Sequence, residues 1–426
     1  MTLLLFVSLF LLLLFIGMPV AISLGLVGVG LAVSMGNFRP VMLGHVMMQG
    51  IDSFSFLAVP FFILAGGFME EGGLSRRLMD FAFALVGRMR GGLAQVAVVM
   101  SVLFAGLSGS AVADTAAVGS MLLPSMKEKG YRAGFCGALV AAGGAIGPII
   151  PPSIAMIVYA VIANVSVGKL FLAGVLPGIG IGLILMILSY IEAVRCHYPR
   201  ETGQFSSSAF FKAIRDGILA LLLPVVILGG IRFGLFTPTE SASVAVVYSF
   251  VLGKFVYKEL KWSKIPAIFA SSALGTAATM VIIAAASFLS WILTSMRIPQ
   301  LLTKALLEFS RDPFVILVII NLFILFLGTL IDGASIVILI TPIVVPVISG
   351  LRIDLVYFGL LLVVNICIGA ITPPVGTCLF VASSVGKINL ADIAKSAIPI
   401  ALCLITWLAV LILFPGIAMF LPNLGQ

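Results

Sequence analysis

Long apolar runs separated by short polar gaps extend along the whole chain. A helix that crosses the roughly 30 Å hydrocarbon core of a membrane needs about 20 mostly apolar residues. Such runs lie at residues 2–17, 20–35, 53–71, 93–126, 133–165, 170–191, 216–233, 239–253, 266–296, 313–350, 355–386 and 396–420. The pattern predicts an all-α integral membrane protein that crosses the lipid bilayer many times. The first run has no basic segment before it and no small-residue cleavage site, so we expect a retained span.

Two of these runs are interrupted near the middle by glycine and polar residues. The run 93–126 is interrupted at 106–110, and the run 313–350 is interrupted at 328–335. Each arm of roughly 15 residues would be about 22 Å long as a helix, which is short for a full crossing. We therefore predict two re-entrant helical hairpins whose tips lie inside the bilayer.

Two other runs are too long for one span and contain prolines at the centre. The run 133–165 would be about 50 Å long as a single helix, and the segment 147–153 within it reads GPIIPPS. The run 355–386 carries GAITPPVGT at 369–377. Proline removes a backbone donor and clashes with the preceding turn, so both runs are predicted to be broken helices.

Matching residues in the two halves lie 222 positions apart. The pairs are Gly106 with Gly328, Pro124 with Pro346, Gly147 with Gly369, Pro151-Pro152 with Pro373-Pro374, and Pro177 with Pro399. This offset predicts a first repeat at 1–191, a cytoplasmic connector at 192–215 and a second repeat at 216–426. Each half has five crossing runs and one returning run, and an odd number of crossings inverts the second repeat. Inverted repeats are typical of secondary transporters, whose site lies near the middle of the membrane.

Composition supports the membrane assignment and excludes several classes of function. The 426 residues are 62% hydrophobic and 9% charged, whereas about a quarter of the residues in a soluble domain are charged. The net charge of +8 does not indicate nucleic-acid binding, because 17 of the 24 Lys and Arg residues lie in loops that are cytoplasmic if the N-terminus is periplasmic. That distribution satisfies the positive-inside rule. The sequence has no P-loop for ATP hydrolysis, and its Cys and His residues form no transition-metal pattern.

Helix breaks inside a bilayer supply the polar groups that an ion or an anion requires. Free backbone carbonyls and Ser or Thr hydroxyls are oxygen ligands suited to Na⁺, and helix N-termini attract anions. Asp114 and Asp332 are costly in hydrocarbon and are therefore functional candidates, although either could instead cap a helix. Glu240 is interpreted as a helix cap near an interface.

Five segments together resemble the large membrane subunit of tripartite ATP-independent periplasmic (TRAP) transporters. They are AVPFFILAG at 58–66, GLSGSAVAD at 106–114, IGPIIPPS at 146–153, GLFTPTE at 234–240 and ITPPVG at 371–376. The resemblance covers the whole chain in order. It implies an elevator-type transporter, in which a domain that holds both hairpins slides against a scaffold.

The resemblance also implies an activity and partners. The expected activity is Na⁺-coupled import of a small organic acid, such as a C4-dicarboxylate, sialic acid or a sugar acid, across the bacterial inner membrane. The expected partners are a periplasmic substrate-binding protein and a small four-helix membrane subunit. Na⁺ is the expected coupling ion, and neither an organic cofactor nor an enzyme activity is implied.

Carried over residue by residue, the resemblance implies three sites at the hairpin tips and helix breaks. The first Na⁺ site would comprise Ser108, Gly109, Ser110, Gly147 and Pro151. The second Na⁺ site would comprise Gly328, Asp332, Gly333, Ser335, Gly369, Thr372 and Pro373. Substrate would lie near Ser110, Asp114, Ser153, Ser335 and Thr377.

Two other functions fit parts of the pattern. A stand-alone Na⁺/carboxylate symporter could share the hairpin plan and would need no binding protein. An intramembrane aspartyl protease could use Asp114 and Asp332 as a dyad, but such enzymes need two carboxylates sharing a proton at close range. The G-x-G-D context expected for such a protease is missing, and the duplicated breaks would be unexplained.

Overall fold

The computed structural model describes residues 8–10, 12–14, 16–36, 38–199 and 207–424, and every regular element in them is helical. The predicted span at 2–17 and the predicted connector at 192–215 lie partly outside these residues. The α-helices are α2 (Val20–Ser34), α3 (Pro40–Ile51), α4 (Ala58–Glu71), α5 (Leu74–Val86), α6 (Gly92–Ser108), α7 (Ala111–Glu128), α8 (Ala133–Gly144), α9 (Ile154–Ala163), α10 (Val167–Arg195), α11 (Ser207–Arg232), α12 (Pro238–Val251), α13 (Ile265–Ser295), α14 (Ile298–Phe309), α15 (Pro313–Gly328), α16 (Gly333–Gly350), α17 (Leu355–Gly369), α18 (Thr377–Gly386), α19 (Leu390–Leu413) and α20 (Pro415–Asn423). Within the described part of the chain, seven helical segments are long and apolar enough to cross a membrane.

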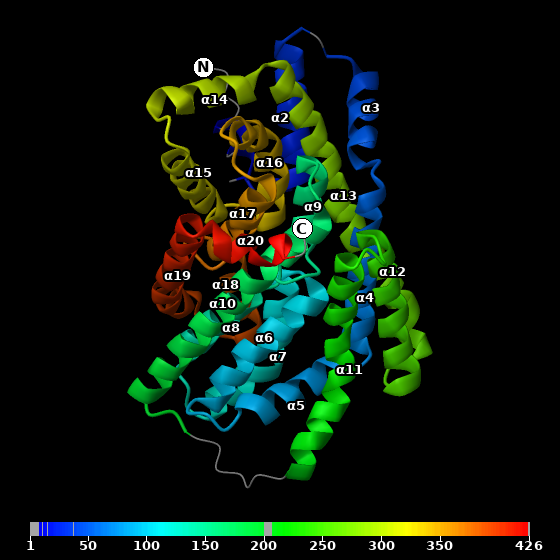
Figure 1. The fold of residues 1–426 in the computed structure, drawn as a ribbon, viewed down its shortest axis with the longest axis vertical. Coiled ribbons are helices and arrows are strands. Elements are labelled where there is room, and N and C mark those ends of the chain that lie inside the picture. Colours follow the sequence, from blue (N-terminus) through cyan, green and yellow to red (C-terminus); the bar gives the residue numbers. More distant parts are fainter. Residues whose placement is uncertain (1–7, 11, 15, 37, 200–206, 425–426) are drawn as a thin grey trace.

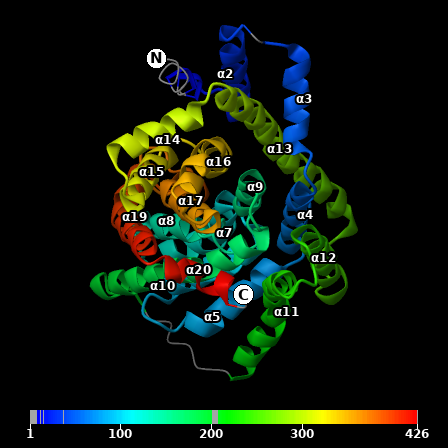
Figure 2. The same ribbon diagram turned by 45° about the horizontal axis from the view of Figure 1, so that its top comes forward.

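The helices form two bodies, which we call the wall and the bundle (Figures 1 and 2). The wall is a curved layer of α2, α3, α4, α11, α12 and α13, in which α12 packs against α4 and α13 packs against α2 and α3. The bundle contains α6 to α10 and α15 to α19 and lies inside the curve of the wall (Figure 2). Both predicted hairpins and both predicted broken helices belong to the bundle.

Two amphipathic helices connect the wall to the bundle at opposite ends of the molecule (Figure 1). α5 follows α4 and packs against α11 and α6, whereas α14 follows α13 and packs against α16. In α5 the buried residues Leu74, Leu78 and Ala82 recur at every fourth position. One apolar stripe of this kind favours a helix that lies along the membrane interface.

The two halves of the chain exchange contacts inside the bundle. α9, from the first half, packs against α16, and α18, from the second half, packs against α7. The second helix of each predicted hairpin is therefore covered by part of the broken helix of the other half. This exchange brings the beginnings of α7, α9, α16 and α18 into one region.

The helix boundaries agree with the sequence at the four breaks. α6 and α7 are separated at 109–110, α15 and α16 at 329–332, α8 and α9 at 145–153, and α17 and α18 at 370–376. The sequence pattern did not predict α3, α5 or α14, and the run 396–420 divides into α19 and α20 at Phe414. The predicted connector at 192–215 is partly helical, because α10 continues to Arg195 and α11 begins at Ser207.

Candidate functional site

The tip between α6 and α7 fits closely against the break between α8 and α9. Gly109 has a left-handed φ of 64°, which glycine adopts without the cost that a side chain would add. A Cβ at Gly109 would also lie 2.4 Å from the carbonyl oxygen of Pro152. Both constraints require glycine at the tip. The hydroxyl of Ser110 caps α7 by accepting a hydrogen bond from the backbone nitrogen of Ala113, over 3.4 Å.

Asp114 lies one turn after this tip and is fully buried. The Ser108 hydroxyl donates a hydrogen bond to its Oδ1, and the same hydroxyl accepts from the backbone nitrogen of Ser110 at 3.1 Å. The other carboxylate oxygen, Oδ2, has no hydrogen-bond partner in the described structure. A Cβ at Gly147 would lie 2.5 Å from this oxygen. A buried carboxylate oxygen without a partner is costly, and a bound cation would satisfy it.

The second tip, between α15 and α16, is built around Asp332. Its carboxylate caps α16 by accepting from the backbone nitrogen of Ser335 at 3.0 Å and from the Ser335 hydroxyl at 2.5 Å. Asp332 and Ser110 thus hold the same capping position in the two halves, in agreement with the offset of 222 residues. The alternative that Asp332 caps a helix is confirmed, and the same carboxylate still borders a cavity.

The second tip also meets a helix break at very short range. The backbone nitrogen of Val375 donates to the carbonyl oxygen of Thr329 at 3.1 Å. A Cβ at Gly369 would lie 2.6 Å from the Cα of Gly328, so both positions need glycine. In the break itself, the Thr372 hydroxyl donates to the carbonyl of Ile368, in the last turn of α17, at 2.6 Å. Peptide bonds Pro151-Pro152 and Pro373-Pro374 are both cis, one in each break.

A cavity of about 270 Å³ lies between the two tips. Its lining includes the first residues of four helices: Ala111 of α7, Ile154 of α9, Gly333 of α16 and Thr377 of α18. Helix N-termini carry free backbone N–H groups and partial positive charge, so they favour an anion. We call this space the inter-tip cavity.

The inter-tip cavity gathers only some of the residues predicted for the sites. Gly109, Ser110, Asp332, Gly333 and Thr377 line it. Ser153 lies outside its lining, and its hydroxyl caps α9 at the backbone nitrogen of Met156 while donating to the carbonyl of Pro148. The other predicted residues that lie outside its lining are Ser108, Asp114, Gly147, Pro151, Gly328, Ser335, Gly369, Thr372 and Pro373.

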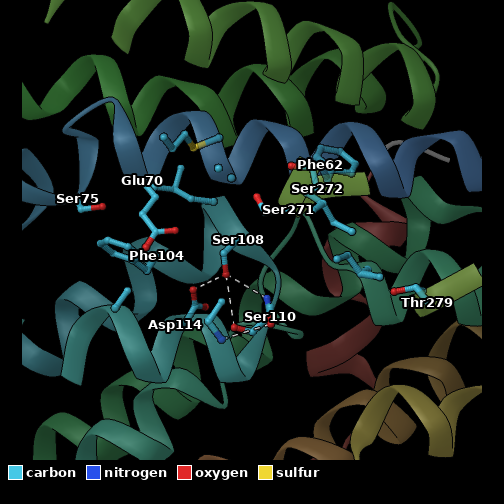
Figure 3. Close-up of a pocket in the computed structure, with 18 residues that line it drawn as sticks. Phe62, Glu70, Ser75, Phe104, Ser108, Ser110, Asp114, Ser271, Ser272 and Thr279 are labelled. Carbon is cyan, nitrogen blue, oxygen red and sulfur yellow. Dashed lines mark hydrogen bonds between the residues drawn. The ribbon is translucent and has the colours of Figure 1, made fainter. Parts of the chain in front are cut away.

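A second cavity, of about 390 Å³, lies between the first hairpin and the wall (Figure 3). Ser108, Ser110 and Asp114 line it from the bundle. From the wall, Glu70 of α4 and Ser271, Ser272 and Thr279 of α13 contribute polar groups, and Figure 3 shows Glu70 directed toward the side of the first hairpin. Ser110, Ile154 and Thr279 line both cavities, so the two spaces adjoin. We call this second space the wall cavity.

Several polar residues near these cavities were not predicted from the sequence. Ser271, Ser272 and Thr279 are short polar residues within an otherwise apolar run, and their spacing of seven or eight positions could have indicated one helix face. Asn321 of α15 and Asn365 of α17 are buried and paired, with the Asn365 amide donating to the Asn321 side-chain oxygen at 3.0 Å. Polar residues in a span are functional or structural candidates by default.

Neither cavity contains a cationic side chain among the described residues that line it. The polar groups of both cavities are therefore carboxylates, hydroxyls and backbone groups. No group of three or more His, Cys, Asp and Glu residues that could hold a metal ion occurs within the described ranges. Oxygen atoms at helix breaks remain the candidate ligands for a hard monovalent cation.

Sequence comparisons connect the chain to transport proteins. A model of the family described as "Tripartite ATP-independent periplasmic transporter, DctM component" matches residues 6–417. The chain is 38% identical to the sialic acid TRAP transporter large permease protein SiaM of Vibrio cholerae, over 97% of this chain and 96% of that protein. It is 41% identical to the C4-dicarboxylate TRAP transporter large permease protein DctM of Pseudomonas aeruginosa, over 88% of each. It is also 38% identical to the isethionate TRAP transporter permease protein DctMQ of Oleidesulfovibrio alaskensis, over 96% of this chain and 65% of that protein.

The fold is similar to that of a solved transporter. The crystal structure of the Alcanivorax borkumensis YdaH transporter, described as having an unusual topology, superposes with a TM-score of 0.65 over 88% of each chain. Sequence identity in that comparison is 14%, so the likeness concerns the fold alone.

Proposed function

The chain belongs to the DctM component family of tripartite ATP-independent periplasmic transporters, and from this premise we propose that it imports a small organic acid by coupling it to Na⁺. Membership makes the chain a transporter permease and not an enzyme, so the protease alternative is dropped. The observation that carries the proposal is the inter-tip cavity, where four helix N-termini and two hairpin tips meet.

The four helix N-termini suit the anionic group of an organic acid. Relatives are named for sialic acid, C4-dicarboxylates and isethionate, which are small acids. A space of about 270 Å³ has room for a molecule of this size. Ser110 and Thr377, which line the cavity, would donate hydrogen bonds to the acid. Since no Lys or Arg is found among the described lining residues, bound Na⁺ would supply the remaining positive potential.

Each hairpin tip, together with the helix break against it, would form one Na⁺ site. The first would use Ser108, Gly109 and Ser110 with Gly147 and Pro151, and the unpartnered Asp114 oxygen beside Gly147 supports a cation there. The second would use the Asp332 cap and the close Gly328–Gly369 contact, together with Gly333, Ser335, Thr372 and Pro373. Binding of Na⁺ would complete the positive environment of the inter-tip cavity and so couple the ion to the acid.

The wall and the bundle would be the scaffold and the moving domain of an elevator. Both hairpins lie in the bundle, and α5 and α14 lead from the wall to the two hairpins at opposite ends of the molecule (Figure 1). Because the two repeats are inverted, the bundle would be able to take two related positions against the wall. In the present one, the wall cavity extends from the first tip toward Glu70 at the end of α4. With the N-terminus on the periplasmic side, as the positive-inside rule favours, Glu70 would lie on the cytoplasmic side. This arrangement would correspond to an inward-facing state.

The transporter would work with two other proteins in the bacterial inner membrane. The family description is tripartite, and the isethionate relative, of which this chain covers 65%, carries the composite name DctMQ. A small membrane subunit and a periplasmic substrate-binding protein would complete the system. The N-terminus would lie on the periplasmic side.

Reconstituted transport tests this function directly. Liposomes that contain the permease and its small subunit should accumulate radiolabelled acid when the binding protein and an inward Na⁺ gradient are both present. Uptake that is unchanged when choline replaces Na⁺ would contradict the coupling. Uptake that needs no binding protein would instead favour a stand-alone Na⁺/carboxylate symporter of similar hairpin architecture.

A further inference from the structure

The wall cavity contains a carboxylate that the proposed Na⁺ and substrate sites do not use. Glu70 is the penultimate residue of α4, and it borders the same space as Ser108 and Asp114 of the first hairpin. Figure 3 shows its side chain extending from α4 toward Phe104, a residue of α6 in the first hairpin. Glu70 belongs to the wall and Asp114 to the bundle, so the cavity places one carboxylate of each body on a shared space.

The polar groups of the wall cavity are those that favour a cation. Its lining includes two carboxylates and the hydroxyls of Ser75, Ser108, Ser110, Ser271, Ser272 and Thr279. None of its described lining residues is Lys or Arg. Oxygen-lined spaces with net negative charge bind hard cations, because carboxylates and hydroxyls replace the water around the ion.

A second observation points to a cation beside this space, at the Oδ2 atom of Asp114, which faces Gly147 at the break between α8 and α9. Asp114 lines the wall cavity and is fully buried, and its Oδ2 atom has no hydrogen-bond partner in the described structure. Glu70 is exposed and lines the same cavity, so its carboxylate can meet an ion that leaves Asp114 for solvent on that side.

We propose that Glu70 forms a transient Na⁺-release site in the wall cavity. The inference rests on the Na⁺ coupling and the inward-facing orientation proposed above. In this position of the bundle, Na⁺ leaves the first hairpin, is held between Glu70 and the wall hydroxyls, and then enters the cytoplasm. The same site admits cytoplasmic Na⁺ back to the first hairpin, so Glu70 sets the sensitivity of import to Na⁺ inside the cell.

The neighbouring Glu71 provides a matched control. Its carboxylate lies 3.4 Å from the Lys264 ammonium at the surface, and it does not line the wall cavity. Glu70 and Glu71 are adjacent, exposed, identical in chemistry and at the end of the same helix. If substitution of Glu70 changes transport and the same substitution of Glu71 does not, the change is therefore due to the position of Glu70 in the wall cavity and not to the general charge of the surface.

Inhibition of uptake by Na⁺ inside proteoliposomes measures the proposed site. Binding protein added only outside restricts the assay to permeases with the periplasmic side outward. In E70Q the luminal Na⁺ concentration that halves uptake should rise about fivefold. This factor corresponds to the loss of the attraction between two unit charges about 4 Å apart in water. The external Na⁺ concentration for half-maximal uptake should not change. E71Q should match the wild type in both measurements, and E70D, which keeps the charge, should retain most of the luminal inhibition.

The outcomes separate this inference from the proposed function. Wild-type uptake that does not need Na⁺ refutes the coupling itself, whatever the variants do. Na⁺-dependent uptake with equal luminal inhibition in wild type, E70Q and E71Q overturns the release site and leaves the coupling intact. If E70Q transports too slowly for the titration, E70D serves as the test. Uptake and luminal inhibition close to the wild type in E70D support the role of the Glu70 charge. Loss of luminal inhibition in both variants overturns that role.

Discussion

At the scale of single residues, Asp332 combines a helix cap with a carboxylate that borders the inter-tip cavity. Asn caps helices about as well as Asp, so Asp332→Asn removes the charge and keeps the cap. We expect the external Na⁺ concentration for half-maximal uptake to rise about tenfold or more, as for loss of a charge-assisted contact. Thermal stability in detergent should stay close to that of the wild type.

Asp312 is a suitable control for Asp332. It caps α15 by accepting from the backbone nitrogen of Phe314 at 2.9 Å and lies at an exposed position outside both cavities. Asp312→Asn should leave the Na⁺ dependence of uptake unchanged, as should Arg76→Ala on the exposed side of α5. Equal effects of the three substitutions would contradict the assignment of Asp332 to a Na⁺ site.

Gly109 should tolerate no side chain at the first tip. A Cβ there costs roughly 1–2 kcal/mol for the left-handed conformation and would also lie 2.4 Å from the Pro152 carbonyl oxygen. We expect Gly109→Ala to reduce the initial rate of uptake more than tenfold. Gly130→Ala isolates the conformational cost, because Gly130 has a φ of 79° and a Cβ added there would have nothing within 4 Å. Similar uptake by both variants would show that the tip does not need its close fit.

At the scale of elements, hydropathy predicted the breaks and missed the helices that connect the two bodies. The breaks at 109–110 and 145–153 were predictable because glycine, proline and serine interrupt long apolar runs, which leaves backbone groups unpaired in hydrocarbon. α5 and α14 were missed because their charged residues lower the average hydropathy, although one face of each is apolar. A search for a period of 3.6 residues would have detected them.

The residues that the wall contributes to the candidate site could not be predicted from the sequence pattern either. Glu70 is 44 residues from Asp114, and Thr279 is farther still, so only the packing of α4 and α13 against the first hairpin places them on one cavity. Neither residue belongs to a repeated break. The internal duplication therefore predicts the bundle half of the site and contains no information on the wall half.

The packing of α5 can be tested with two of its leucines that differ in burial. Leu78 is fully buried, whereas Leu85 is 50% exposed. Leu78→Ala should lower the free energy of unfolding by about 2–5 kcal/mol because it leaves a cavity under the helix, and the thermal transition in detergent should fall. Leu85→Ala should shift that transition little. Equal shifts would show that α5 is not held by its buried face.

At the scale of the whole molecule, the elevator mechanism proposed above requires the bundle to move past the wall during transport. Gly106 of α6 and Pro224 of α11 lie across the boundary between the bodies, and a Cβ at Gly106 would be 3.5 Å from the Cβ of Pro224. This separation falls within the range of a disulfide. Gly106→Cys combined with Pro224→Cys should therefore form a bridge on oxidation, in a background where Cys196 and Cys403 are replaced by serine.

Under the proposed elevator mechanism, a bridged bundle cannot reach the outward position, so oxidation should abolish uptake and a reductant should restore it. Binding of Na⁺ to the bridged protein from the cytoplasmic side should persist, because the cross-link leaves the hairpin tips and the wall cavity in place. The single variants Gly106→Cys and Pro224→Cys should transport equally well before and after oxidation. Full uptake by a protein whose bridge is verified by mass spectrometry would exclude sliding at this boundary. Substrate would then have to reach the inter-tip cavity by movement of the hairpins alone, with the bundle fixed against the wall.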